Sequence, residues 1–287
     1  MSLITRLYRG ETEFDVISGR NRWFTVSGVV IVASLLSLLV FGLDLSVDFT
    51  GGTIVEAPNE SGVDVGEIRD ELGTLGLEDA RIQLLEGEQA RLRVQTEALE
   101  PDDQDELTTV IATLAGVTFD DTEVDAVGPT FGEEITRRAI EALVVFLIVV
   151  VIFISWRFEW KMAVAALAAL FHDLIITFGI YSLLQFEVTP ATIIAILTIL
   201  GYSLYDTVVV FDKITENVNE LATKFTFAEI GNLSMNQVLM RSINTSLTSL
   251  LPIGSLLFVG SYLLGATTLR EFALALFIGV AAGTYSS

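Results

Sequence analysis

The 287 residues are 52% hydrophobic, and 37 acidic residues against 16 Lys and Arg give the chain a net charge of −21. So large an acidic excess argues against a nucleic-acid partner, because phosphate binding depends on Lys and Arg. There is no cysteine, which excludes disulfides, thiol chemistry and cysteine metal sites.

The first part of the chain predicts a membrane anchor. Residues 1–22 are polar and carry four arginines, and an apolar run follows at 23–43. That run is long enough to cross a hydrocarbon core about 30 Å thick. We interpret it as a transmembrane helix retained after a cytoplasmic N-terminal segment.

Most of the negative charge lies in the next segment, 44–138. Residues 44–130 hold 22 acidic residues and four arginines, a net charge of −18. Self-repulsion on this scale is screened at high salt, so the sequence suggests a halophilic, archaeal source, and we expect the segment to melt at higher temperature as KCl is raised. The alternative is an acidic domain without salt adaptation. The sequon at Asn59 is a candidate glycosylation site.

Alternation and turn signals in this segment predict the order βαββαβ. Strands are expected at 45–57, 80–85, 90–96 and 123–127, and helices at 63–75 and 102–115. Gly51 and Gly52 suggest a bulge in the first strand, and residues 86–88 suggest a hairpin. This order is that of an extracytoplasmic α+β ferredoxin-like domain inserted between transmembrane helices 1 and 2.

The remaining sequence predicts five more transmembrane helices, giving an α-helical membrane protein with six. They are expected at about 139–156, 162–184, 190–211, 241–264 and 271–287, with Pro252 as a kink and a polar link at 212–240. The last run is short for a span, which suggests that the chain is truncated at Ser287. No phosphate loop, zinc-ligand spacing or nucleophile motif is evident, so we expect neither an enzyme nor a cofactor.

The distribution of Lys and Arg predicts the orientation in the cell membrane. The N-terminal arginines, the turn with Arg157 and Lys161 and the link at 212–240 fall on one side, which the positive-inside rule makes cytoplasmic. Arg137, Arg138 and Arg270 fall on the other side. Residues 44–138 would then be extracytoplasmic.

Asp206 is the ionisable residue with the clearest functional pattern. Tyr202, Ser203 and Thr207 accompany it on a polar stripe of the helix at 190–211, and charges at membrane depth tend to be functional. The alternative is a helix that ends early and leaves Asp206 at the interface.

Arg241 opens the next predicted helix, followed on one face by Asn244, Thr245 and Thr248. Antiparallel helices would bring Arg241 to the depth of Asp206, so we expect the two to form an ion pair. The alternative is that Arg241 snorkels to the interface.

His172 and Asp173 lie near the middle of the helix at 162–184. Imidazole suits proton handling, which makes the pair a candidate relay. The alternative for a single histidine is a packed or capping residue.

Several motifs in order resemble one family. They are VDFTGG at 47–52, VGPT at 127–130, WRFEW at 156–160, LFHD at 170–173, GYSLYDTVVVFD at 201–212, REFALAL at 270–276 and GTYSS at 283–287. Together they resemble the SecF family of protein-export membrane proteins, which is similar to half of a resistance-nodulation-division transporter.

The resemblance implies a subunit that pairs with SecD and uses the ion gradient to promote export. Its implied partners are SecD, the Sec translocon channel, the translocating polypeptide and membrane lipids. It implies ion coupling by Asp206 and Arg241, and a structural motif with Asp48, Gly51 and Gly52. Tyr205 departs from the asparagine of many members, which leaves H⁺ and Na⁺ both open. The competing hypotheses are a small-solute exporter half and a non-conducting scaffold for SecD.

Overall fold

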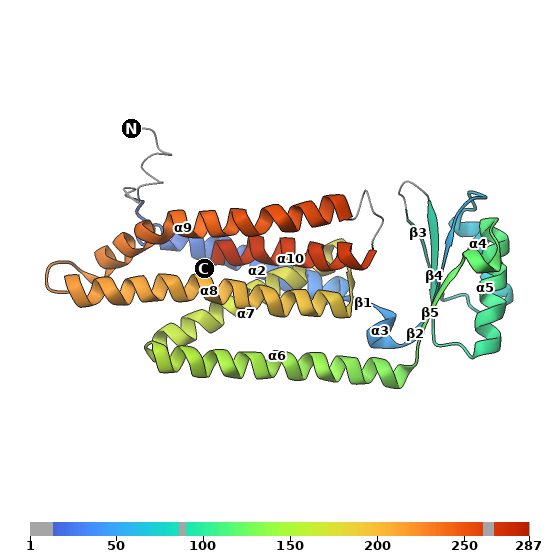
Figure 1. The fold of residues 1–287 in the computed structure, drawn as a ribbon, viewed down its shortest axis with the longest axis horizontal. Helices are drawn as coiled ribbons and strands as arrows, with labels where there is room; N and C mark the ends of the chain where they lie inside the picture. The colour runs from blue at the N-terminus through green and yellow to red at the C-terminus, as the bar shows by residue number, and fades with distance from the viewer. Residues whose placement is uncertain (1–13, 86–89, 261–266, 287) are drawn as a thin grey trace. The chain divides into compact units, whose positions relative to one another are not determined.

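The computed structural model describes residues 14–85, 90–260 and 267–286 of the chain, which divides into two compact units (Figure 1). The first unit runs to Asp44 and resumes from Ala142 to the C-terminal helix, and the second holds Leu45–Glu141. Each unit is described by itself. The expected hairpin at 86–88 lies outside the described residues.

The first unit is built from long helices. They are α2 (Arg20–Phe41), the later part of α6 (Pro129–Arg157), α7 (Trp160–Leu184), α8 (Pro190–Leu221), α9 (Phe227–Ser255) with the π-helical segment η2 (Leu256–Gly260), and α10 (Thr267–Ser286), with the short strands β1 (Asp44–Leu45) and β6 (Glu187–Val188). In the described part of the chain, five helices are long and apolar enough to cross a membrane: α2, α6, α7, α8 and the helix at Phe227–Gly260. The helix expected at 271–287 is α10, which is not among these five.

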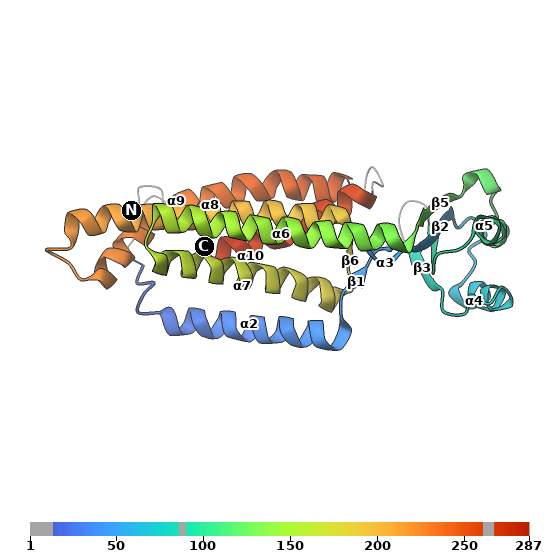
Figure 2. The same ribbon diagram turned by 90° about the horizontal axis from the view of Figure 1, so that it is seen from below.

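Helix α8 holds this unit together. It contacts α7, α9 and α10, while α2 packs along α7, as Figure 2 shows. Helix α6 joins through an apolar cluster in which Val150 and Ile154 meet residues of α7 and α8. The close contact of α2 with α7 depends on Gly179, because a Cβ there would lie 2.7 Å from the Cα of Ser34.

Two helices extend much further than their apolar sequence indicates. The expectation that 212–240 is a link between two helices is wrong, because α8 continues to Leu221 and α9 already begins at Phe227. Polar side chains join these extensions: the Asn217 amide donates to Ser234 Oγ and to Gln237 Oε1, both at 2.8 Å. Hydropathy predicts only the part of a helix that lies in lipid. These two helices continue beyond that part, where polar contacts such as those of Asn217 join them.

The segment before α2 is bound to the start of α9 by two asparagine side chains. Asn236 accepts from Phe14 N at 2.9 Å and donates to Phe14 O at 2.8 Å. Asn232 Oδ1 accepts from the backbone N–H groups of Val16 and Ile17. The backbone polar groups of this segment are therefore satisfied by α9.

The second unit is a four-stranded antiparallel sheet with the order β3-β4-β2-β5. Its elements are α3 (Val47–Thr50), β2 (Gly52–Pro58), α4 (Val65–Thr74), β3 (Arg81–Leu85), β4 (Arg91–Thr96), α5 (Pro101–Ala115), the 3-10 turn η1 (Phe119–Asp121) and β5 (Glu123–Val127), and the first turns of α6 also belong to it. From β2 onwards this gives the order βαββαβ. The core lies between the sheet and helices α4 and α5, where Val55, Leu92, Ile68 and Leu107 are fully buried.

The first strand differs from its expected form. Residues Val47–Thr50 form the short helix α3, and the strand begins only at Gly52. Gly51 ends α3 with φ 75°, so the pair of glycines makes a helix-to-strand turn and not a bulge within a strand. Elsewhere the expectation holds: Asp64 caps α4 by accepting from Glu67 N at 3.1 Å, and β5 has the expected bounds.

The sequon asparagine already has a structural role. Asn59 Nδ2 donates to Val63 O at 3.1 Å, and Asn59 Oδ1 accepts from Val63 N at 3.0 Å. A glycan would be attached to the same nitrogen that donates this hydrogen bond to Val63 O. Glycosylation of Asn59 stays a prediction.

The turn η1 provides a prediction on pH. Asp121 Oδ2 accepts from Thr118 Oγ1 at 2.7 Å and from Thr118 N at 3.2 Å, and these bonds hold the pKa of Asp121 below its usual range. A depressed pKa contributes stability above the unfolded-state pKa, and this contribution is lost as the pH falls through the folded-state value. Replacing Thr118 with Val should raise the pKa of Asp121, measured by carboxyl-carbon NMR titration. An unchanged titration would show that the side-chain bond does not act on Asp121.

Candidate functional site

Asp206 lies in the middle of α8 and is 1% exposed. Helix α8 is set by its start, where Thr189 caps the helix in a reciprocal pair with Thr192 and Pro190 occupies the first turn. This start fixes the face that carries Asp206. Neither carboxylate oxygen has a hydrogen-bond partner among the described residues. The alternative from the sequence, a helix that ends soon after Asp206, does not fit, because α8 continues to Leu221.

Arg241 does not form the expected ion pair with Asp206. Its guanidinium donates to Tyr205 Oη at 2.5 Å and lies 5.6 Å from the centre of that ring. Among the described residues, Arg241 makes neither a hydrogen bond nor an ion pair with Asp206. The expectation placed Arg241 at the start of a helix, whereas it lies well inside α9.

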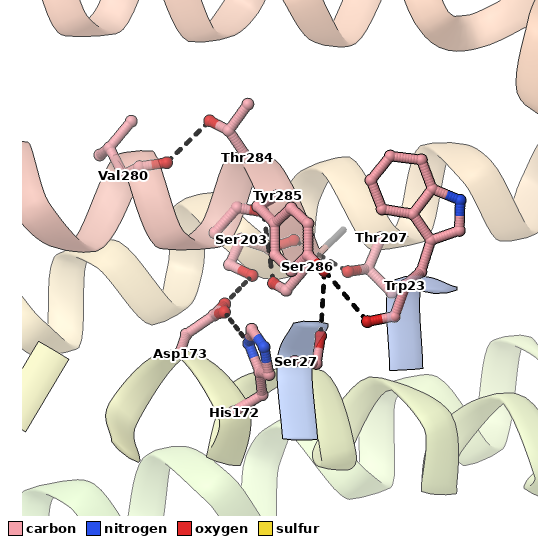
Figure 3. Close-up of polar contacts among 11 residues, drawn as sticks. Trp23, Ser27, His172, Asp173, Ser203, Thr207, Val280, Thr284, Tyr285 and Ser286 are labelled. Carbon is pink, nitrogen blue, oxygen red and sulfur yellow. Dashed lines mark hydrogen bonds and ion pairs between the residues drawn. The ribbon is translucent and has the colours of Figure 1, made fainter. Parts of the chain in front are cut away.

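Asp173 is the second buried carboxylate, also 1% exposed, and it has two partners (Figure 3). Ser203 Oγ of α8 donates to Asp173 Oδ2 at 2.6 Å, and His172 Nδ1 lies 3.1 Å from Asp173 Oδ1. The structure thus brings together His172, Asp173 and Ser203, which the sequence placed on two different helices. Ser203 connects this group to the helix of Asp206.

The other polar residues singled out from the sequence divide into two groups. Tyr202 Oη donates to Ser246 Oγ of α9 at 3.3 Å, and Thr207 bonds to Ser203 O at 3.0 Å. Of the face expected on the second helix, Arg241 bonds to α8, whereas the hydroxyls of Thr245 and Thr248 bond to carbonyls of their own helix and Asn244 is exposed. Hydroxyls within a helix commonly satisfy themselves in this way.

Helix α10 contributes a contact that sequence reasoning missed. Thr284 donates to Ser246 at 2.9 Å, so Ser246 joins α8, α9 and α10. The ring of Tyr285 stacks on His172, with centres 6.0 Å apart and an interplanar angle of 27°. Thr284 and Tyr285 belong to the GTYSS motif at 283–287. The small and hydroxyl-bearing residues of that motif were the sequence signal for these contacts.

Asp48, Gly51 and Gly52 lie where backbone segments of the second unit approach one another closely. Asp48 Oδ2 accepts from Ser46 Oγ at 3.1 Å. A Cβ at Gly51 would lie 2.8 Å from the Cα of Pro129, and one at Gly52 would lie 2.6 Å from Thr96 O. Larger residues would therefore force backbone apart at these positions.

Two buried carboxylates, Asp173 and Asp206, lie at the site of α7 and α8, and a carboxylate is a group that can bind and release a cation. The described residues contain no group of three or more His, Cys, Asp or Glu side chains placed to hold a metal ion. The described residues include five apolar candidate spans, and an α+β unit is inserted in the chain between α2 and the apolar part of α6. These features define a multi-pass membrane protein.

Comparison with known proteins identifies the family. Residues 107–287 match the family model "Protein export membrane protein SecD/SecF, C-terminal", and residues 36–58 match the SecD/SecF GG motif. The chain belongs to the SecF family, whose members are accessory subunits of the Sec protein-export machinery.

Relatives at 34–40% identity cover nearly the whole chain. The protein translocase subunit SecF of Streptomyces coelicolor is 40% identical over 288 residues, which cover 100% of this chain and 77% of the relative. SecF of Sebaldella termitidis is 36% identical, with coverages of 96% and 88%. SecDF of Bacillus subtilis is 34% identical, and the match covers 96% of this chain and 37% of SecDF.

The same likeness is found among solved structures. The crystal structure of SecDF, a translocon-associated membrane protein from Thermus thermophilus, matches with a TM-score of 0.86 and 35% identity. The match covers 100% of this chain and 38% of that one. None of these relatives supports the halophilic, archaeal source inferred from the acidic composition, which stays a hypothesis.

Proposed function

We propose that this chain works with SecD as an ion-coupled subunit, and that Asp206 is the carboxylate that takes up and releases the coupled ion. The observation that carries the proposal is the burial of Asp206 within a membrane span, with both oxygens unpartnered among the described residues. A buried carboxylate without a partner is costly in its ionised form, so such a group is retained where its charge is used.

Arg241 gives this carboxylate two states. It is bonded to Tyr205, the residue next to Asp206, and a change of its side-chain rotamer would exchange the phenol for the carboxylate as its partner. Arg241 beside Asp206 favours the ionised carboxylate, and Arg241 on Tyr205 favours the neutral acid. Ion uptake and release at Asp206 would thus accompany the movement of Arg241 between its two acceptors.

The proposal includes a membrane topology. Helix α10 serves as a sixth span, and the sheet order β3-β4-β2-β5 with two helices on one face supports a ferredoxin-like domain. The N-terminus and the α8–α9 turn are cytoplasmic, where Lys213 and Lys224 add to the N-terminal arginines. Residues 44–138 are then extracytoplasmic.

The partners follow from the relatives. Since SecDF joins a SecD part to a SecF part in one chain, we propose that this chain binds a separate SecD and, with it, the Sec channel and the exported polypeptide. The relatives are named as protein translocase subunits, and this supports the export function over a small-solute exporter. We expect no catalysed reaction. A non-conducting scaffold is the alternative that variants of Asp206 decide.

Depletion of the chain tests the export function. Cells that lose it should accumulate uncleaved precursors of secreted proteins while small-molecule efflux is unchanged, measured by pulse-labelling and by dye efflux. The full-length chain should purify with SecD in mild detergent. Normal precursor processing after complete depletion, with slower dye efflux, would favour the solute exporter.

A further inference from the structure

We propose that Tyr285 is a positioning residue for His172: it fixes the imidazole so that Nδ1 stays on Asp173, and it covers this buried pair on the side of α2. A role of this contact in ion coupling rests on the function proposed above.

The aromatic ring of Tyr285 lies against the imidazole. The centres are 6.0 Å apart at 27°, a stacked arrangement within the range of favourable aromatic pairs. His172 is 9% exposed, and its Nε2 has no hydrogen-bond partner among the described residues. The imidazole is thus held by one polar contact, to Asp173, and by this stack.

The hydroxyl of Tyr285 bonds to α2 both as an acceptor and as a donor. It accepts from Ser27 Oγ at 3.2 Å and donates to Trp23 O at 3.2 Å, as Figure 3 shows. The indole of Trp23 also lies 6.2 Å from the Tyr285 ring. Since a backbone carbonyl cannot rotate away, the phenol has little freedom to leave the imidazole.

The neighbours of Tyr285 on α10 fix its position along the same buried group. A Cβ at Gly283 would lie 3.2 Å from Ser203 Cβ and 3.5 Å from Asp173 Oδ2, so α10 approaches the Ser203–Asp173 bond closely. Thr284 is bonded to Ser246 of α9. Three consecutive residues of α10 therefore contact α7, α8, α9 and α2.

This geometry selects one form of the imidazole. The groups around it are Asp173 from α7, which accepts from Ser203 of α8, the phenol of Tyr285 from α10 and Ser27 from α2. With Nδ1 donating to a carboxylate oxygen of Asp173, the ring carries its proton on Nδ1, and Nε2 has no partner among the described residues. Tyr285 preserves this tautomer by preventing rotation of the ring.

The chain offers a direct test, because His172 is its only histidine. We would label histidine with ¹⁵N and ¹³C in the full-length chain, purified with SecD through a histidine-free tag, using unlabelled SecD. Nitrogen shifts report the tautomer, and carbon-bound ring protons report the stacked phenol. The variants are Tyr285→Leu, which removes the stack, and Tyr285→Phe and Ser27→Ala, which remove bonds to α2. Tyr181→Phe is the matched control on α7, about 13 Å along the helix from His172.

We expect one set of imidazole signals in the wild type, with the proton on Nδ1 and ring protons displaced by the phenol. Tyr285→Leu should lose that displacement and show exchange between tautomers, and Tyr285→Phe and Ser27→Ala should broaden the signals while keeping part of the displacement. Tyr181→Phe should match the wild type. Wild-type nitrogen and proton shifts in Tyr285→Phe and Ser27→Ala would overturn the proposal, even if Tyr285→Leu failed to fold. These spectra do not depend on Asp206, so a failure here is distinct from a failure of the proposed ion coupling.

Discussion

Replacing Asp206 with Asn should reduce export of a reporter protein by at least about tenfold. The substitution keeps the size of the side chain and removes its capacity to bind and release a cation. One charge crossing 100 mV provides about 2.3 kcal/mol, which corresponds to about fiftyfold in rate. A subunit that no longer couples to the gradient should lose much of this factor. The measurement is the rate of precursor processing at normal expression of the chain.

The matched control for this variant is Asp212→Asn on the same helix. Asp212 is paired with Arg157 at 2.8 Å, but both side chains are more than half exposed, and exposed pairs contribute little. We expect near-normal export. Wild-type export by Asp206→Asn, with SecD still bound, would make Asp206 structural and leave the scaffold as the function of the chain.

Replacing Gly179 with Ala should destabilise the first unit by about 1–3 kcal/mol, the usual cost of overpacking. A Cβ at Gly179 would meet both the side chain and the backbone of Ser34, so α2 has to move away from α7. Small residues allow this close packing in membranes, where helix association depends on contact. The loss is measured as a lower midpoint of thermal unfolding in detergent.

Gly28→Ala provides the control, because Gly28 lies on α2 and a Cβ there would meet nothing within 4 Å. It should keep the wild-type midpoint or raise it slightly, since Ala favours helix. Equal midpoints for the two variants would contradict the packing of α2 on α7.

The sequence predicted the elements of the second unit well because its signals are local. Asp64 as a cap and the alternating sequence of β3 and β4 each depend on a few neighbouring residues. The error at Val47–Thr50 arose because a short apolar stretch next to glycine fits a strand and a helical turn equally well.

The helices of the first unit were found, and the end of α7 and the start of α8 have the expected positions, but the end of α8 and the start of α9 do not. Hydropathy gave the apolar lengths, and it missed the polar extensions of α8 and α9 that Asn217 ties together. A local signal did exist for the start of α9: Thr226 and Glu229 form a capping box. Reading it would have placed Arg241 inside a helix.

The sequence pointed to the ionisable residues of the candidate site, but it did not identify their hydrogen-bond partners. Buried ionisable residues stand out in an apolar sequence, so Asp206, Asp173 and His172 could be named. Their partners depend on helix rotation, which a sequence does not specify, and so Arg241 was assigned to Asp206 although it bonds to Tyr205. The contacts of Tyr285 and Ser246 likewise depend on the packing of four helices.

Ion flux through the purified complex tests the central claim most directly. Full-length chain and SecD would be reconstituted into vesicles that contain dyes for pH and for Na⁺, and a membrane potential would then be imposed. If Asp206 couples ion movement to export, one of these ions should flow with the wild-type chain, and this flux should be lost with Asp206→Asn at equal SecD content. If Asp206→Asn carried either ion at the same rate as the wild-type chain does, ion coupling by Asp206 would be contradicted.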